Sequence, residues 1–198
     1  MTREPLHWIL ATSNPGKLAE YRALLADTSI RLEALSGAAA PAETGLSFVE
    51  NALIKARHAA SATGRPAIAE DSGLCVDALS GAPGVRSARY AGDHATDEEN
   101  RLKLLLALEG CPDGERQADF HCVIVALRRP DDPAPVLATG RWVGEIARSP
   151  RGSNGFGYDP VFVVPGLGMT AAELTRVAKN AISHRYLASL ELRRQLGW

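Results

Sequence analysis

The chain opens with a short apolar run that is followed at once by the signals of a helix start. Leu6 to Thr12 has the length and composition of a buried strand. Asn14 then suits a helix N-cap and Pro15 suits the first helical position. Apolar residues recur after them at helical spacing, namely Leu18, Tyr21 and Leu25. The sequence therefore predicts a strand, a turn and a helix in succession.

The same alternation continues after this first unit. Ser47 and Glu50 form a capping-box pattern, so a second helix is predicted from Ser47 to a stop at Gly64. Its apolar stripe consists of Leu46, Val49, Leu53, Ala56 and Ala60. A second short apolar run, Pro66 to Ala69, follows this helix, and Ser72-Gly73 soon after it predicts a tight turn.

The second half of the chain is richer in strand patterns. Helices are expected at Asp97 to Leu108 and at about Lys179 to Leu196, and strands at Phe120 to Leu127, Val136 to Ile146 and Pro160 to Val164. Strands that alternate with helices, and then a β-rich stretch, predict an α/β fold with a mixed sheet and flanking helices. The 198 residues contain no repeat or low-complexity linker, so we expect one domain, 1–198, with room for two lobes.

Two adjacent carboxylates stand at the end of the Pro66 to Ala69 run. Glu70 and Asp71 repel each other unless something positive is shared between them. A divalent metal would supply that charge, and so would a lysine; a solvated acidic turn is the alternative. Glu43, just before the second helix, is a third candidate metal ligand, and Lys55 lies on that helix away from its apolar stripe.

The first turn carries groups suited to an anion. A helix N-terminus offers free N–H groups and the positive end of the helix dipole, Gly16 lets an anion approach the backbone, and Lys17 adds a charge. The turn lacks the Walker A pattern, because Ala11 and Leu18 stand where that pattern needs glycine and Ser or Thr. A phosphate site and a merely well-capped helix both fit this turn.

Aromatic and basic residues mark two further segments. The loop Gly152 to Asp159 contains Phe156 between glycines, which suits stacking on a base, although a turn whose Phe and Tyr are part of the core fits equally. Lys179, His184 and Arg185 place donors near the expected start of the last helix, where cations oppose the helix dipole unless an acceptor is near.

Composition excludes several classes of protein. A formal net charge of −1 gives no general attraction to a polynucleotide or an anionic membrane, and no apolar run is long enough for a membrane helix. The three cysteines show no paired spacing, so neither a disulfide framework nor a zinc site is indicated. Buried thiols and a start unlike a signal peptide favour a reducing, cytoplasmic location.

Taken together, these motifs resemble those of the inosine/xanthosine triphosphate pyrophosphatase family. They run in family order across nearly the whole chain: Thr12 to Lys17, Glu43 to Ala52, Ala69 to Gly73, Gly81 to Val85, Gly155 to Pro160 and Ser183 to Arg185. The resemblance implies an elongated α/β fold, with a central mixed sheet and two lobes around a deep active-site cleft, and a homodimer. It also implies Mg²⁺-dependent hydrolysis of ITP, dITP or XTP at the α–β phosphate bond, giving the monophosphate and pyrophosphate and cleansing the nucleotide pool.

The resemblance assigns roles by position. The implied triphosphate-binding residues are Thr12, Ser13, Asn14, Pro15, Gly16, Lys17 and Lys55. Asp71 is implied as catalytic base and metal ligand, with Glu43 and Glu70 as further metal ligands and Ser72 touching substrate. The implied base and sugar pocket consists of Phe156, Gly157, Tyr158, Asp159, Lys179, His184 and Arg185. The chain departs from the family pattern at Ala42, Glu70 and Ser13, where relatives have Glu, Asp and Gly.

Two other functions remain open on the sequence. One is a related pyrophosphatase that acts on modified pyrimidine nucleotides, which a panel of substrates would distinguish. The other is a nucleotide sensor that binds without hydrolysis. The acidic pair argues against a sensor, because two carboxylates facing a polyphosphate add little to binding.

Overall fold

The computed structural model describes residues 6–12, 14–26, 28 and 30–198, which divide into two compact units. Unit 1 contains the described residues up to Asp71 together with Cys122–Gly140 and Arg185–Trp198. Unit 2 contains Ser72–His121 and Arg141–His184. The chain thus passes from one unit to the other at Asp71/Ser72 and at His184/Arg185, within motifs that the sequence singled out.

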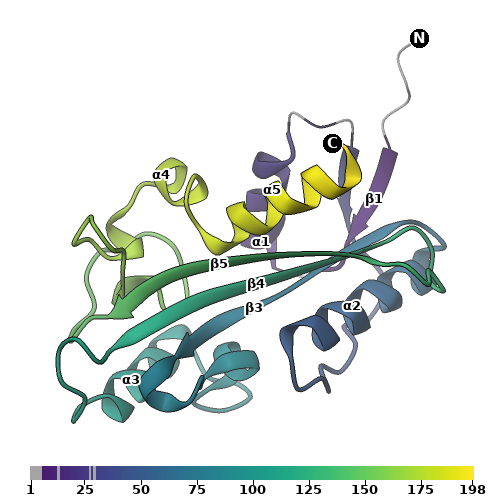
Figure 1. The fold of residues 1–198 in the computed structure, drawn as a ribbon. Helices are drawn as coiled ribbons and strands as arrows, with labels where there is room; N and C mark the ends of the chain where they lie inside the picture. Colours follow the sequence, from purple (N-terminus) through teal and green to yellow (C-terminus); the bar gives the residue numbers. More distant parts are fainter. Residues whose placement is uncertain (1–5, 13, 27, 29) are drawn as a thin grey trace. The chain divides into compact units, whose positions relative to one another are not determined.

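The described residues form a mixed sheet of six strands in the order β2-β1-β3-β4-β5-β6 (Figure 1). The strands are β1 Leu6–Leu10, β2 Ile30–Ala34, β3 Ala67–Val76, β4 Gln117–Leu127, β5 Val136–Ile146 and β6 Phe162–Val163. Strand β1 runs parallel to β2 and β3, whereas β5 and β6 are antiparallel. The predicted α/β class with a mixed sheet is confirmed.

The helices begin and end mostly where local capping signals place them. They are α1 Pro15–Leu24, α2 Phe48–Thr63, α3 Asp97–Ala107, α4 Arg176–Asn180 and α5 His184–Leu196. Asn14 caps α1, and Ser47 and Glu50 form the predicted capping box of α2. Gly64 ends α2 with a φ of +66°, a conformation that glycine adopts without steric cost.

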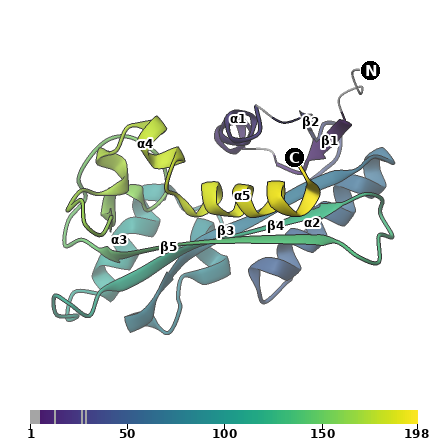
Figure 2. The ribbon, with the colours of Figure 1, turned by 45° about the horizontal axis from the view of Figure 1, so that its top comes forward.

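In unit 1, α1 and α5 lie side by side on one side of the strands and α2 covers the other (Figures 1 and 2). Tyr21 of α1 and Leu192 of α5 pack with Ile68 of β3 in one apolar cluster. On the α2 side, small residues allow close approach of the helix to the sheet; they are Ala52, Ala56 and Ala69. Helices on both faces leave β3 buried on both sides within this unit.

Unit 2 has a separate core around an aromatic cluster. Leu104 and Leu108 from the α3 segment pack with Leu74 of β3, Phe120 of β4 and Trp142 of β5. Phe162 lies 4.6 Å from Phe120 and 5.0 Å from Trp142, measured between ring centroids. This core holds the loop that precedes β6.

Two expectations of the sequence are wrong. The expected turn at Ser72-Gly73 does not form, because β3 continues to Val76 and so buries Leu74 and Val76 in the core of unit 2. The expected last helix is two helices, since α4 ends at Asn180 and α5 begins at His184. Lys179 therefore lies in the last turn of α4, where a cation is favoured by the helix dipole.

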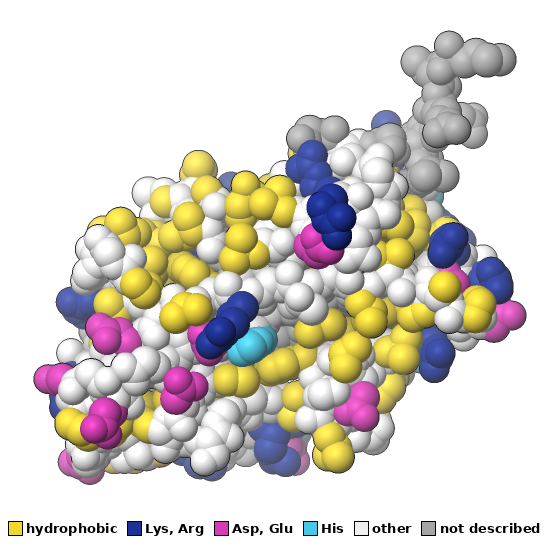
Figure 3. All heavy atoms as spheres, in the orientation of Figure 1, with side chains coloured by type: hydrophobic (Ala, Val, Ile, Leu, Met, Phe, Trp, Pro, Cys, Tyr) yellow, Lys and Arg dark blue, Asp and Glu magenta, His cyan; other side chains and the backbone are white. Residues whose placement is uncertain are grey.

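On the face seen in Figure 3, acidic side chains gather at the lower left, where α3 lies, and basic ones are scattered among apolar side chains elsewhere. Across the described ranges, every helix is too short or too polar to cross a membrane.

Candidate functional site

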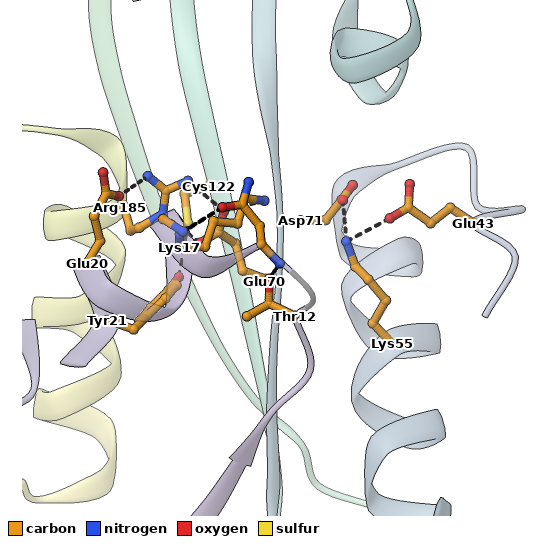
Figure 4. A network of polar contacts seen from close by, with 12 residues as sticks. Thr12, Lys17, Glu20, Tyr21, Glu43, Lys55, Glu70, Asp71, Cys122 and Arg185 are labelled. Carbon is orange, nitrogen blue, oxygen red and sulfur yellow. Dashed lines mark hydrogen bonds and ion pairs between the residues drawn. The ribbon is translucent and has the colours of Figure 1, made fainter. Parts of the chain in front are cut away.

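The acidic pair lies within β3, and its two side chains have different partners (Figure 4). Successive residues of a strand point to opposite faces of the sheet. Asp71 consequently contacts Lys55 of α2, whereas Glu70 contacts Lys17 of α1 and Arg185 of α5. Both carboxylates and all these partners belong to unit 1. The shared positive charge that the sequence argument required is supplied by basic side chains from both faces.

Lys55 joins two carboxylates on the α2 face. Its Nζ donates to Oδ1 of Asp71 at 2.6 Å and to Oε1 of Glu43 at 3.0 Å. Asn51, one helical turn before Lys55, donates to Oδ2 of Asp71 at 3.5 Å. The side chain of Asp71 is 10% exposed and that of Glu43 is 29% exposed. Of the two carboxylates that contact Lys55, Glu43 is therefore the more accessible to solvent.

Burial governs the protonation of this group. It raises the pKa of the Asp71 carboxyl above its usual value, which Lys55 opposes and Glu43 reinforces. Burial also lowers the pKa of Lys55, but Asp71 and then Glu43 outweigh it, so the net shift is upward. A carboxylate with a raised pKa is a stronger base than an ordinary aspartate, and the lysine beside it stays charged.

The oxygens around Lys55 fit a hard divalent cation. The ammonium lies between carboxylate oxygens of Asp71 and Glu43, in a place where a cation is stabilised by both. Mg²⁺ is usually held by one or two carboxylates together with substrate phosphates and water. Within the described part of the chain, no group of three or more His, Cys, Asp or Glu side chains could hold a metal. Two protein ligands and a phosphate are therefore the set that these residues can offer.

Glu70 is engaged on the opposite face. Arg185 donates to it in bidentate fashion, from Nε to Oε2 at 2.7 Å and from Nη2 to Oε1 at 2.8 Å. Lys17 Nζ lies 3.0 Å from Oε1, and Arg185 Nη1 also donates to Glu20 at 2.6 Å. Burial lowers the pKa of Arg185, but the contacts with Glu70 raise it by more than burial lowers it. The net shift of the pKa is upward, so the guanidinium stays charged. A metal ion on Glu70 would compete with these cations.

The turn before α1 satisfies much of its own backbone. Oδ1 of Asn14 accepts from the N–H groups of Gly16 at 2.8 Å and of Lys17 at 3.1 Å, and Thr12 Oγ1 accepts from the Asn14 N–H. Pro15 begins the helix without an N–H to satisfy. Ser13 lies outside the described residues. The N–H groups of Gly16 and Lys17 are thus used by the cap, and the cation of this turn is the Lys17 side chain, 22% exposed.

Unit 2 holds most of the residues expected at the base. Phe156 is 40% exposed, whereas Tyr158 is buried and donates to the Ser87 carbonyl at 2.8 Å. The Gly157 N–H donates to Asp97 at 2.7 Å. The phenylalanine of this loop is thus available to a ligand, while the tyrosine is part of the core.

The two basic residues of unit 2 that the resemblance places at the base, Lys179 and His184, are buried. Lys179 forms an ion pair with Asp159, and both are nearly inaccessible. His184 stacks on Phe120, with ring centroids 4.8 Å apart and 12° between the planes. Ser72 is half-buried in β3 at the start of this unit. Arg185, placed by resemblance with the base pocket, belongs to unit 1 and pairs with Glu70 there.

Sequence reasoning missed two residues of these networks. Glu20 follows Lys17 by three positions on α1, a spacing that puts both on one helix face, so it could have been found. Phe120 lies 64 positions before His184 in the chain, and a strand pattern alone does not indicate such a contact. Asn51 precedes Lys55 by four positions, a spacing that puts both on one helix face, and it too contacts Asp71.

The fold and the site together define a class of protein: an α/β protein with a mixed sheet and a buried group of carboxylates and lysine. The chain belongs to the Ham1 family, whose model matches residues 8–195.

Similar proteins cover almost the whole chain. It is 58% identical to the dITP/XTP pyrophosphatase of Yersinia pestis over an alignment of 179 residues. This alignment covers 89% of this chain and 91% of the Yersinia protein. The corresponding protein of Escherichia coli O157:H7 is 56% identical over 179 residues, with 89% and 91% covered. A HAM1 protein structure from Coxiella burnetii superposes with a TM-score of 0.90 at 54% identity, covering 97% of this chain and 98% of that one. A nucleoside-triphosphatase / dITP/XTP pyrophosphatase structure from Mycobacterium abscessus gives 0.78 at 45% identity, covering 93% and 98%.

Proposed function

We propose that this chain hydrolyses non-standard purine nucleoside triphosphates, namely ITP, dITP and XTP, to the monophosphate and pyrophosphate. The observation that carries the proposal is the bridge from Asp71 through Lys55 to Glu43. Such a group can bind a cation and a polyphosphate together and can also accept a proton. The high identity to proteins named dITP/XTP pyrophosphatases supports the same substrate class.

The charges of unit 1 suit the triphosphate and its metal. Asp71 and Glu43 would hold Mg²⁺, and Lys55 and Lys17 would face the phosphate oxygens. Mg²⁺ bound there would supply positive charge that neutralises the phosphates as charge develops in the transition state. The resemblance names Glu70 as a further ligand, but Arg185 and Lys17 already neutralise it on the opposite face of the sheet, so Glu70 is left out of the proposed metal site.

Asp71 is the proposed catalytic base. In the reaction a water oxygen would bond to a phosphorus of the α–β anhydride as the bridging bond breaks, which separates the nucleoside monophosphate from pyrophosphate, and the proton of that water would pass to a carboxylate oxygen of Asp71. Asp71 would stand beside the cations that meet the phosphates, because its carboxylate contacts Lys55 at 2.6 Å. The partner Asn51 holds Oδ2 of Asp71 through its amide and would thereby orient the carboxylate.

The groups of unit 2 suit the nucleobase. Phe156 offers an aromatic face for stacking, and Lys179 and His184 offer donors for the 6-oxo group of inosine and xanthosine bases. Adenine carries an amino group, a hydrogen-bond donor, at that position. The adenine amino group would therefore face the donors of the protein, with no acceptor between them. Unpaired buried polar groups discriminate between substrates by orders of magnitude. Arg185 is proposed to support this choice from its pair with Glu70.

The remaining expectations are part of the proposal. The substrate pocket would be shaped by Pro15, Gly16, Gly157, Tyr158 and Ser72. Its phosphate-binding turn would be formed by Thr12, Ser13 and Asn14. The protein would act as a homodimer in the cytoplasm and bind no polynucleotide. A deep cleft between two lobes, implied by the resemblance, stays a prediction.

One experiment tests the reaction class. Each nucleoside triphosphate, including modified pyrimidine ones, is offered with Mg²⁺, and the products are identified by chromatography and pyrophosphate release. We expect monophosphate and pyrophosphate from ITP, dITP and XTP, with much slower turnover of ATP. Preferred turnover of a pyrimidine nucleotide, orthophosphate as product, or tight ITP binding without turnover would each replace the proposal with another function.

A further inference from the structure

The loop before β6 is folded around one carboxylate oxygen. Oδ2 of Asp159 accepts from the Phe156 N–H at 2.9 Å and pairs with the Nζ of Lys179. Asp159 is 2% exposed and Lys179 is 6% exposed, so the charges are nearly shielded from water. Two groups expected at the nucleobase are thus held by a third residue that is more deeply buried than either.

Gly155 shows how closely the loop wraps this oxygen. Its φ is +75°, and a Cβ at this position would lie 2.0 Å from Oδ2 of Asp159. A side chain is therefore excluded both by the backbone conformation and by the carboxylate. The loop can close around Asp159 only because glycine stands at position 155.

The ion pair of Asp159 and Lys179 also limits which part of the Phe156 ring is accessible to a ligand. Nζ of Lys179 lies 4.9 Å from the centroid of the Phe156 ring, in a cation–π arrangement. The ring is still 40% exposed, so the ammonium covers only part of it. A planar base would stack where the ammonium does not lie.

The far sides of this loop are anchored within unit 2. Arg101 of α3 donates to the Gly157 carbonyl at 2.8 Å, and Asp97 accepts from the Gly157 N–H. Tyr158 is fixed through its hydroxyl to the Ser87 carbonyl. While α3 and the core hold the loop at Gly157 and Tyr158, the Asp159 carboxylate links the Phe156 backbone to the ammonium of Lys179.

We propose that Asp159 is a positioning residue that acts through Lys179 and Phe156 and does not itself touch the nucleotide. The inference rests on the proposed function and departs from the role that resemblance gives to Asp159. A ligand that bonded to Oδ2 would have to displace a buried ammonium and a backbone N–H, which the pair opposes. Asp159 instead holds the ammonium beside the Phe156 ring, whose exposed part would meet the base.

A double-mutant cycle between Asp159→Asn and Lys179→Met tests this, with kcat and KM measured on ITP and Mg²⁺ by pyrophosphate release. We expect each single variant to raise KM about tenfold with a smaller effect on kcat. The decisive comparison is between Lys179→Met and the double variant, which removes both charges and leaves no unpaired one. We expect these two to have the same KM within about twofold, because Asp159 has nothing to position once Lys179 is gone.

Two measurements separate positioning from general damage. Inhibition by inorganic tripolyphosphate, which lacks a base, should be unchanged in all three variants. Asp132→Asn is the matched control, because Asp132 is also a buried aspartate, 3% exposed, and pairs with Arg128 in the β4–β5 connection. This control should lower stability without raising KM for ITP.

The outcomes are distinct from a failure of the proposed function. Wild-type protein that releases no pyrophosphate from ITP would remove the proposed function itself. With an active wild type, a further tenfold rise in KM on adding Asp159→Asn to Lys179→Met would mean that Asp159 contacts the base directly. Weaker inhibition by tripolyphosphate in the double variant would equally overturn the inference, since the effect would then extend to the phosphates.

Discussion

The Nζ of Lys55 lies 2.6 Å from Oδ1 of Asp71, so a lysine from α2 is held by the second carboxylate of the acidic pair in β3. The same ammonium reaches Glu43 at 3.0 Å. One lysine thereby holds two carboxylates close together. If these carboxylates held a divalent cation, the long lysine side chain could pair with a phosphate oxygen instead. The arrangement is thus suited to a cation and an anion that bind together.

Asp71→Asn should lower kcat for ITP by about 10²–10⁴-fold, because an amide does not accept the proton of the attacking water. The fold should persist, because Glu43 still pairs with Lys55 in the variant. Burial raises the pKa of Asp71, so the stability that this carboxyl contributes is present at low pH and is lost as pH rises through the raised pKa, a pH dependence that the variant should lack. Asp131→Asn, on a side chain that is 83% exposed, is the control. Wild-type turnover by Asp71→Asn would remove Asp71 from the mechanism.

Glu43→Gln tests whether Glu43 is a metal ligand or only a partner of Lys55. As a ligand, its loss should raise the Mg²⁺ concentration for half-maximal activity by about 10–100-fold, with activity recovered at high Mg²⁺. If Glu43 only holds Lys55, kcat should fall while the Mg²⁺ dependence stays that of the wild type. Titration of ITP hydrolysis with Mg²⁺ distinguishes these results.

Glu70→Gln should destabilise the protein rather than change its metal dependence. The substitution removes the bidentate acceptor of Arg185, a side chain that is 1% exposed, and breaking such a buried pair costs about 3–5 kcal/mol. Urea denaturation gives the change in the free energy of unfolding. Glu191→Gln breaks an exposed pair with Arg194 and should have a much smaller effect. A stable Glu70→Gln variant with a raised Mg²⁺ requirement would instead establish Glu70 as a ligand.

Local signals predicted the helices well because capping is decided within a few residues. Asn14 and the Ser47–Glu50 box lie where the structure needs them. Strand β2 was missed although its signal is present, since Ile30 and Leu32 are buried in alternation with more exposed neighbours. The end of β3 was misplaced because Ser72-Gly73 favours a turn locally, and only the core of unit 2 shows why the strand continues.

The sequence predicted which residues belong to the candidate site. It did not predict which acidic residue contacts which basic residue. Asp71, Lys55 and Glu43 were each singled out, and the structure brings them together. The contact between Arg185 and Glu70 spans 115 positions, and no local pattern encodes it. Chemistry could therefore be assigned from motifs, whereas the choice of which cation neutralises which carboxylate required the tertiary structure.

Cys122 should be unreactive in the folded protein. Burial raises the pKa of its thiol, and its Sγ lies 3.9 Å from the Tyr21 hydroxyl inside the core of unit 1. The thiol therefore stays protonated at pH 8, and the thiolate that attacks alkylating reagents does not form. N-ethylmaleimide followed by peptide mass spectrometry should label Cys122 only in urea, with the half-buried Cys111 labelled earlier. Equal labelling of both in native protein would show that this core opens readily.

Gly155→Ala compared with Gly157→Ala isolates the space around Asp159. Both glycines have positive φ, +75° and +60°, so both substitutions carry a backbone cost of about 1–2 kcal/mol. Only at Gly155 would the new Cβ meet the Asp159 carboxylate, whereas nothing lies within 4 Å at Gly157. Gly155→Ala should consequently lower stability more than Gly157→Ala and raise KM for ITP about tenfold more, because the displaced carboxylate releases Lys179 and Phe156. Steady-state kinetics with thermal melts of both variants measure this, and equal KM values would show that the close packing around Asp159 has no bearing on how the base is bound.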